Sequence, residues 1–178
     1  MKKKTKMLAE AGVCIALSVA LSFLKIAPVA DGGSIDLVMI PLCFFALKWG
    51  AGWGFLAGLV FGTIKLFLGG HALTLISFVF DYSVAYAAVG LAGLFGKKEG
   101  TRPFGAFFGG FARFIIHVIS GFTVYAKWMP EEFLGMHMSN AVIYSLIYNG
   151  IYMIPNIIIC VLVIALLNKP LRKLYESK

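Results

Sequence analysis

FVFDYSVAYAAVGLAGLF, residues 78–95, is an apolar stretch that contains one charged side chain, Asp81. An α-helix needs about 20 apolar residues to cross a hydrocarbon core of roughly 30 Å. An ionisable group inside such a helix is costly in free energy, and it usually faces a cavity or a polar partner. The stretch therefore predicts a membrane helix, with Asp81 as a candidate functional residue.

The composition of the whole chain is that of a membrane protein. Of its 178 residues, 60% are hydrophobic and 13% are charged, and the mean hydropathy is +0.89. Soluble domains contain about 45–50% apolar and about 25% charged residues. We predict an all-α integral membrane protein, a single domain over residues 1–178 with six transmembrane helices. The spans are expected at about 7–27, 36–48, 53–69, 72–96, 103–126 and 139–168.

Basic residues predict the orientation of these helices. With six spans, twelve Lys and Arg residues lie on the side of the two termini, three lie on the opposite side, and Arg113 falls inside a span. Because basic residues accumulate on the cytoplasmic side of membrane proteins, both termini are expected to be cytoplasmic. MKKKTK at the start is interpreted as a cytoplasmic anchor rather than part of a signal peptide, since the apolar run after it is long enough to span. The net charge of +8 is thus explained by topology, and it does not indicate nucleic-acid binding.

Polar side chains of three predicted helices fall at a similar depth. At about 1.5 Å per residue, Asp81 and His117 lie about nine residues from the outer ends of their segments, roughly 14 Å deep. Tyr148 and Asn149 lie about ten residues from the outer end of the last one. Tyr82 adjoins Asp81, Tyr144 lies one turn above Tyr148, and Tyr125 lies two turns outward of His117. Together with Phe61, these aromatic residues are expected to surround the acid. Two interpretations are open, a ligand pocket that opens to the outside and a structural network in which Asp81 pairs with Arg113.

The residue types indicate which ligand such a pocket would bind. A carboxylate surrounded by aromatic rings suits a flat organic cation, because each ring face adds about 0.5–2 kcal/mol of cation–π attraction. His117 and Asn149 can form hydrogen bonds with the heteroatoms of such a ligand.

Enzymatic and metal-binding motifs are absent from the sequence. It contains no HExxH, GxSxG or calcium-loop pattern, and GLAGLFGKKEG (residues 90–100) does not have the glycine spacing of a phosphate-binding loop. Cys14, Cys43 and Cys160 are far apart and lie in apolar runs, so neither a metal site nor a disulfide framework is expected. We predict no cofactor and no catalytic residue. A chain of this kind that transports actively must take its energy from an ion gradient or from a partner.

Five strings along the chain resemble one known family, the thiamine-specific S-components of energy-coupling factor (ECF) transporters. These strings are GGSIDLVMIPLCFFALKWG (32–50), GLVFGTIKLFLGG (58–70), FDYSVAYAAVGLAGLF (80–95), ARFIIHVISG (112–121) and YSLIYNGIYMIPN (144–156). The resemblance implies a six-helix protein of the bacterial plasma membrane that binds thiamine from outside. It also implies three partner chains, a membrane-embedded coupling subunit and two cytoplasmic ATPases, which power uptake.

The resemblance also implies roles for particular residues. Asp81 matches an acidic position of the family's binding site, and Tyr82, His117, Tyr144 and Asn149 match other positions of that site. Residues 28–34 resemble a lid over the site. Ala16-x-x-x-Ala20 is similar to the small-residue motif that contacts the coupling subunit, although internal helix packing is the alternative for such a motif.

The sequence departs from some relatives at the predicted site. These relatives have glutamate where this chain has Asp81, and tryptophan at the positions of Phe61, Tyr125 and Gly32. A smaller and less electron-rich cage is expected. Arg113 aligns with a basic residue of the family, and we expect it to hold Asp81 or another polar group in place.

Two alternative functions are kept. The first is an S-component for a thiamine precursor or for another vitamin. The second is an ion-coupled secondary transporter, although such proteins usually have more spans or an internal repeat.

Overall fold

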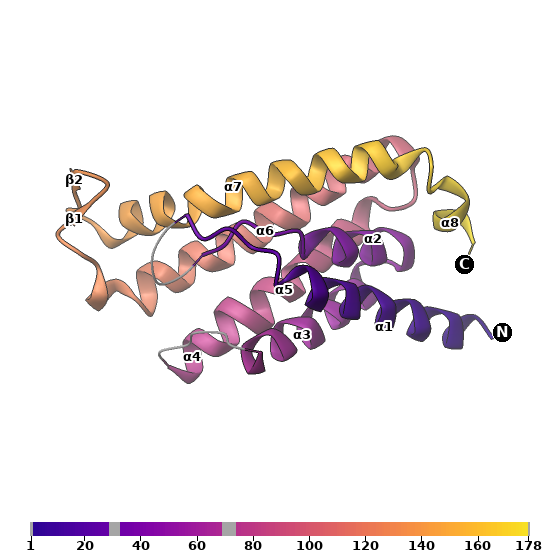
Figure 1. Cartoon of the computed structure of the whole chain (residues 1–178), viewed down its shortest axis with the longest axis horizontal. Helices are drawn as coiled ribbons and strands as arrows, with labels where there is room; N and C mark the ends of the chain where they lie inside the picture. The colour runs from indigo at the N-terminus through magenta and orange to yellow at the C-terminus, as the bar shows by residue number, and fades with distance from the viewer. Residues whose placement is uncertain (1, 29–32, 69–73, 178) are drawn as a thin grey trace.

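The structure is a computed structural model that describes residues 2–28, 33–68 and 74–177. Its described part is a bundle of helices with one short β-hairpin (Figure 1). The longer helices are α1 (Lys3–Leu21), α2 (Met39–Trp49), α3 (Ala51–Phe67), α6 (Arg102–Thr123) and α7 (Ala141–Asn168). The shorter elements are α4 (Leu75–Phe78), η1 (Val79–Val84), α5 (Ala85–Ala88), η2 (Val89–Phe95), η3 (Glu99–Thr101), η4 (Ala126–Trp128), β1 (Glu132–Phe133), β2 (Met136–His137) and α8 (Arg172–Glu176).

Three helical runs among the described residues are long and apolar enough to cross a membrane: Ile76–Phe95, Glu99–Thr123 and Ala141–Asn168. The helices α2 and α3 are apolar but shorter than a full span. α1 carries four charged residues near its start, and its surface exposes Leu8, Val13 and Leu17.

The short helix α2 forms the centre of the core. Met39, Leu42, Cys43 and Ala46 are buried there, and they pack against side chains of α3, η2, α6 and α7. An 11-residue helix is about 16 Å long, too short to cross the bilayer by itself. The stretch of residues 33–38 before it is not α-helical, and such backbone is tolerated at membrane depth where protein covers it.

Glycines permit one tight turn and one close helix packing in the bundle. Gly50 has a φ of +100°, a conformation open to glycine, and it joins α2 to α3 without a loop. Gly58 and Gly62 bring α3 against the run of residues 75–95. A Cβ atom at Gly58 would lie 2.2 Å from the Tyr86 carbonyl oxygen, and one at Gly62 would lie 2.2 Å from that of Tyr82.

Both termini lie at one end of the bundle, here called the terminal end, and the β-hairpin and α4 lie at the opposite end, called the hairpin end (Figure 1). At the terminal end, the ring of Tyr175 on α8 is buried between two side chains. Its centroid lies 4.0 Å from Arg102 Cζ and 4.6 Å from the centroid of the Phe44 ring. A second contact at this end is the ion pair of Lys48 with Glu10, at 2.8 Å. These contacts tie α1, α2, α6 and α8 together.

Candidate functional site

Asp81 and Tyr82 lie in a π-helical segment, η1, rather than in regular α-helix. The run of residues 75–95 changes from α-helix to π-helix, back to α-helix, and then to 3₁₀-helix at η2. A π-helical turn widens a helix and shifts the direction of its side chains, and such turns are frequent at functional sites. This local geometry sets how Asp81 faces the neighbouring helices.

The Asp81 carboxylate lies beside His117 of α6. Asp81 Oδ1 is 3.4 Å from His117 Nδ1, and the two side chains are 16% and 10% exposed. Tyr125, which follows the end of α6, interacts through its hydroxyl with Asp81 and with Ser77 of α4. Three of the residues predicted from the sequence, Asp81, His117 and Tyr125, are therefore brought together.

Asn149 is buried on α7, opposite His117. Its Nδ2 donates to the Ser145 carbonyl oxygen at 2.8 Å and lies 3.4 Å from that of His117. Its Oδ1 accepts a hydrogen bond of 2.5 Å from the Tyr152 hydroxyl. Both ends of the Asn149 amide are thus held in a fixed orientation.

Three tyrosines line one face of α7. Tyr144 and Tyr148 are 5.7 Å apart between ring centroids, and Tyr148 and Tyr152 are 6.2 Å apart. The row ends beside His117, whose ring lies 6.0 Å from that of Tyr152. Phe133 of the β-hairpin covers the other end, with its ring 5.2 Å from Tyr144. The row therefore connects the hairpin to the Asp81–His117 pair.

Sequence reasoning missed Tyr152 and Phe133. Tyr152 follows Tyr148 by four residues, so helical spacing could have placed it on the same face. Phe133 carries no such signal, because only the hairpin fold brings it over Tyr144 and Tyr148.

Tyr82 and Phe61 occupy different environments. The Tyr82 side chain is half-buried on η1, next to Asp81 in the sequence. Phe61 of α3 is fully buried, and its ring makes an edge contact with Tyr86 at 4.7 Å. Phe61 thus packs behind the run that carries Asp81, and its contact with a ligand stays a prediction.

Arg113 lies over an aromatic ring rather than on Asp81. Its Cζ is 4.0 Å from the centre of the Tyr86 ring, and no ion pair within 4.0 Å joins its guanidinium to the Asp81 carboxylate. Arg113 is buried, and its Nε and Nη1 have no hydrogen-bond partner among the described residues. The guanidinium therefore leaves the Asp81 carboxylate to His117 and Tyr125.

The segment before α2 is fastened to α7 by Asn156. The Asn156 Nδ2 donates to the Ser34 carbonyl oxygen at 2.8 Å, and its Oδ1 accepts from the Asp36 backbone N–H at 2.8 Å. Ile26 and Ile35 pair through two backbone hydrogen bonds. The connection between α1 and α2 is thus closed at its base, while residues 29–32 of the predicted lid, including Gly32, lie outside the described residues.

Gly33, one of the described residues of the predicted lid, shows how close this segment comes to the tyrosines of α7. A Cβ atom at Gly33 would lie 1.9 Å from Cδ1 of Tyr152, so this glycine lies directly against the tyrosine row. The connection between α1 and α2 therefore approaches the site at this position.

The predicted partner-contact residues, Ala16 and Ala20, are both exposed on α1. Gly12, one turn before Ala16, has nothing within 4 Å of the position of a Cβ atom. This face of α1 is thus not used for packing within the described part of the chain.

A metal site is not formed by the described residues. Residues 2–28, 33–68 and 74–177 contain no group of three or more His, Cys, Asp and Glu side chains able to hold an ion.

The fold and this site define a class, a helical membrane protein with a polar, aromatic-rich site among its helices. Comparison with known families matches residues 8–176 to the family described as thiamine transporter protein. The chain belongs to this family, which is a family of bacterial membrane transporters rather than enzymes. The resemblance stated from the five sequence strings is thereby confirmed.

Individual relatives agree with this assignment. The chain is 32% identical to the thiamine transporter ThiT of Bacillus subtilis (strain 168), over 83% of this chain and 81% of the relative. It is 26% identical to ThiT of Lacticaseibacillus paracasei, over 99% and 93% of the two chains. The solved structure of ThiT from Listeria monocytogenes matches with a TM-score of 0.85 over 98% and 99% of the chains, at 22% identity, and it supports the fold.

Proposed function

We propose that this protein is the thiamine-binding membrane subunit of an ECF transporter. It binds thiamine from outside the cell and delivers it together with a membrane coupling subunit and two cytoplasmic ATPases. The proposal includes six spans in the plasma membrane with both termini in the cytoplasm. It is supported by the family assignment, by the relatives' description as thiamine transporters, and by termini that share one end of the bundle.

The observation that carries the proposal is the environment of Asp81. Thiamine joins a cationic thiazolium ring to an aminopyrimidine. The Asp81 carboxylate can neutralise the thiazolium, because the only ion-pair partner that the described residues give it is His117, which is charged only when protonated. The ring of His117 and the hydroxyl of Tyr125 lie next to that carboxylate, so both aromatic side chains can line the bound cation.

The tyrosine row suits the aminopyrimidine. Tyr144 and Tyr148 have hydroxyl groups that can donate to or accept from its ring nitrogens and amino group. Asn149 is already held by Ser145 and Tyr152, but its Oδ1 has a second lone pair that can accept from the amino group. In this arrangement Tyr82 and Phe61 complete the aromatic surroundings.

Calorimetry with the purified full chain and thiamine tests the proposal. We expect tight binding by the wild type and a loss of about 2–5 kcal/mol, roughly 30- to 4,000-fold, for Asp81→Asn, because the cation then lacks its buried counter-charge. Glu131→Gln makes the same charge change on an exposed side chain and should leave the affinity unchanged. Equal affinities for wild type and Asp81→Asn would show that Asp81 has a structural role.

Two further measurements separate the alternatives. Competition of thiamine with pyrimidine precursors and riboflavin distinguishes a thiamine subunit from an S-component of another specificity. Uptake by vesicles that contain this chain alone would identify an ion-coupled secondary transporter, whereas the proposed subunit should transport only with its ATPases.

A further inference from the structure

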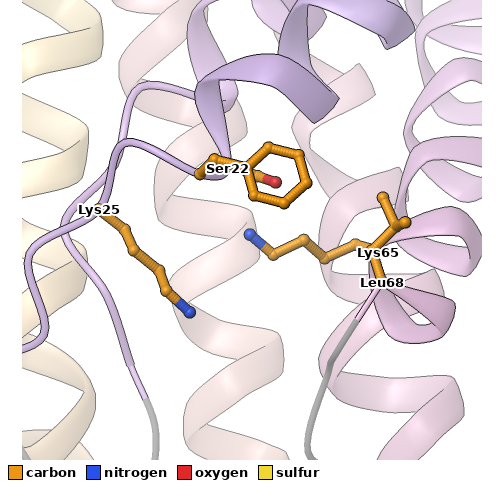
Figure 2. A pocket seen from close by; sticks show the side chains of 5 residues that line it. Ser22, Lys25, Lys65 and Leu68 are labelled. Carbon is orange, nitrogen blue, oxygen red and sulfur yellow. The ribbon is translucent and has the colours of Figure 1, made fainter.

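A separate cavity lies between the end of α1 and the last turn of α3. Its volume is about 110 Å³, and Ser22, Phe23, Lys25, Lys65 and Leu68 line it. None of these residues belongs to the candidate thiamine site. In Figure 2 the side chains of Lys25 and Lys65 extend toward the same space from opposite sides, with Ser22 beside them.

The two ammonium groups bring a net positive charge to this cavity. Lys25 and Lys65 repel each other electrostatically. Neither of them forms a hydrogen bond or ion pair with another described residue. Asp36 attracts Lys65 without forming an ion pair, and its carboxylate also accepts hydrogen bonds from the Ser34 hydroxyl at 3.1 Å and from the Val38 backbone N–H at 3.2 Å. An anion in the cavity would therefore be stabilised by both lysines.

The size and donors of the cavity fit a phosphate group. One water molecule needs about 10–15 Å³ of such volume, so about 110 Å³ admits a larger, tetrahedral group. The two ammonium groups supply six N–H donors, and the Ser22 hydroxyl can supply another. Lysine ammonium groups are common phosphate binders in proteins.

The rim of the cavity indicates where the phosphate comes from. Phe23 and Leu68 line the cavity and are 67% and 49% exposed, and the neighbouring Phe67 is 81% exposed. Exposed apolar side chains next to paired lysines at the end of membrane helices match the boundary between lipid headgroups and acyl chains. We propose that this cavity binds a phosphate group, supplied by the headgroup of an anionic phospholipid.

Lipid binding to the purified full chain tests the proposal by native mass spectrometry. The probe is phosphatidylglycerol, and diacylglycerol with the same acyl chains is the phosphate-free comparison. We expect phosphatidylglycerol to be retained by the wild type, with at least a 10-fold loss for the double variant Lys25→Gln/Lys65→Met. Lys127→Gln, another basic residue predicted on the same side of the membrane, should bind as the wild type does.

A second arm separates the two sources of phosphate. The melting temperature of each variant is measured in inorganic phosphate and in chloride at equal ionic strength. If phosphate stabilises the wild type but not the double variant, while phosphatidylglycerol binds both equally, the site is a phosphate site and the lipid source is wrong.

The proposal is overturned if neither probe distinguishes the wild type from the lysine variants. Lys25→Gln alone, on an exposed side chain, keeps the test decisive if the double variant fails to fold. Lys65→Arg should retain both effects, because the positive charge is kept.

Discussion

At the scale of single residues, the protein keeps the charges of Asp81 and Arg113 apart. Asp81 lies beside His117, whereas Arg113 on the same helix as His117 stacks on Tyr86. The guanidinium on the Tyr86 ring therefore does not neutralise the Asp81 carboxylate through a direct ion pair. Under the proposed function, this leaves Asp81 available to the thiazolium cation.

Tyr86 should consequently stabilise the fold through its ring. We expect Tyr86→Leu to lower the free energy of unfolding by about 1–2 kcal/mol beyond lost packing, because the buried guanidinium loses its cation–π partner. Tyr86→Phe keeps the ring and should cost less. Thermal unfolding in detergent checks this, and equal melting temperatures for the two variants would contradict it.

At the scale of elements, the π-helical segment η1 and the glycines of α3 form one packing unit. Gly58 and Gly62 lie against the carbonyl oxygens of Tyr86 and Tyr82, which flank the turn after Asp81. The close approach fixes the position of the run that carries Asp81. A sequence reading finds these glycines as small residues at a helix interface, but it does not show which backbone they contact.

Gly58→Ala should therefore disturb this unit. Its Cβ atom would meet the backbone 2.2 Å away, and overpacking of a core costs about 1–3 kcal/mol. Gly52→Ala lies on the same helix with nothing within 4 Å of its Cβ position, so it should be neutral or slightly stabilising. Thermal unfolding of the two variants compares them directly, and equal stability would show that the contact relaxes without cost.

Asn156 is a second residue that fixes one element against another, because its hydrogen bonds hold the connection between α1 and α2 on α7. We expect Asn156→Ala to leave a buried N–H and a carbonyl group unpaired, at a cost of about 1–3 kcal/mol. The loosened connection should speed thiamine dissociation about 5- to 30-fold, as measured by stopped-flow fluorescence.

Asn140→Ala is the matched control for Asn156→Ala. It removes the cap of α7, in which Asn140 Oδ1 accepts from the Val142 N–H at 2.7 Å, and should cost about 1 kcal/mol of stability. Its thiamine dissociation rate should match that of the wild type. If both variants release thiamine equally fast, Asn156 acts through global stability only.

At the scale of the whole molecule, the two ends of the bundle differ in structure. The hairpin end holds the connection between α1 and α2, the hairpin, and the residues around Asp81. The terminal end is closed by α8, by Tyr175 on Arg102 and by the Lys48–Glu10 ion pair. Between them, the face of α1 with Ala16 and Ala20 is left exposed along the side of the bundle.

That face of α1 should serve docking rather than folding. We expect Ala16→Trp and Ala20→Trp to retain thiamine affinity within about threefold and to abolish uptake with the complete transporter, because bulky side chains prevent close helix approach. Leu166 lies on α7 and its side chain is 74% exposed, so Leu166→Trp should leave both thiamine binding and uptake intact. Loss of thiamine binding in the Ala16 and Ala20 variants would indicate internal packing instead.

The amino-acid sequence by itself determined that this is a helical membrane protein, which residues are the candidate acid and imidazole, and which family the chain resembles. Hydrophobicity, charge and motif spacing are local properties, so they can be read along the chain. Tertiary structure alone decided that Arg113 lies on Tyr86, that Asn156 holds Ser34 and Asp36, that Phe133 covers Tyr144, and that Lys25 faces Lys65. Each of these arrangements brings together residues from different elements of the fold, and its geometry depends on how all the helices pack at once.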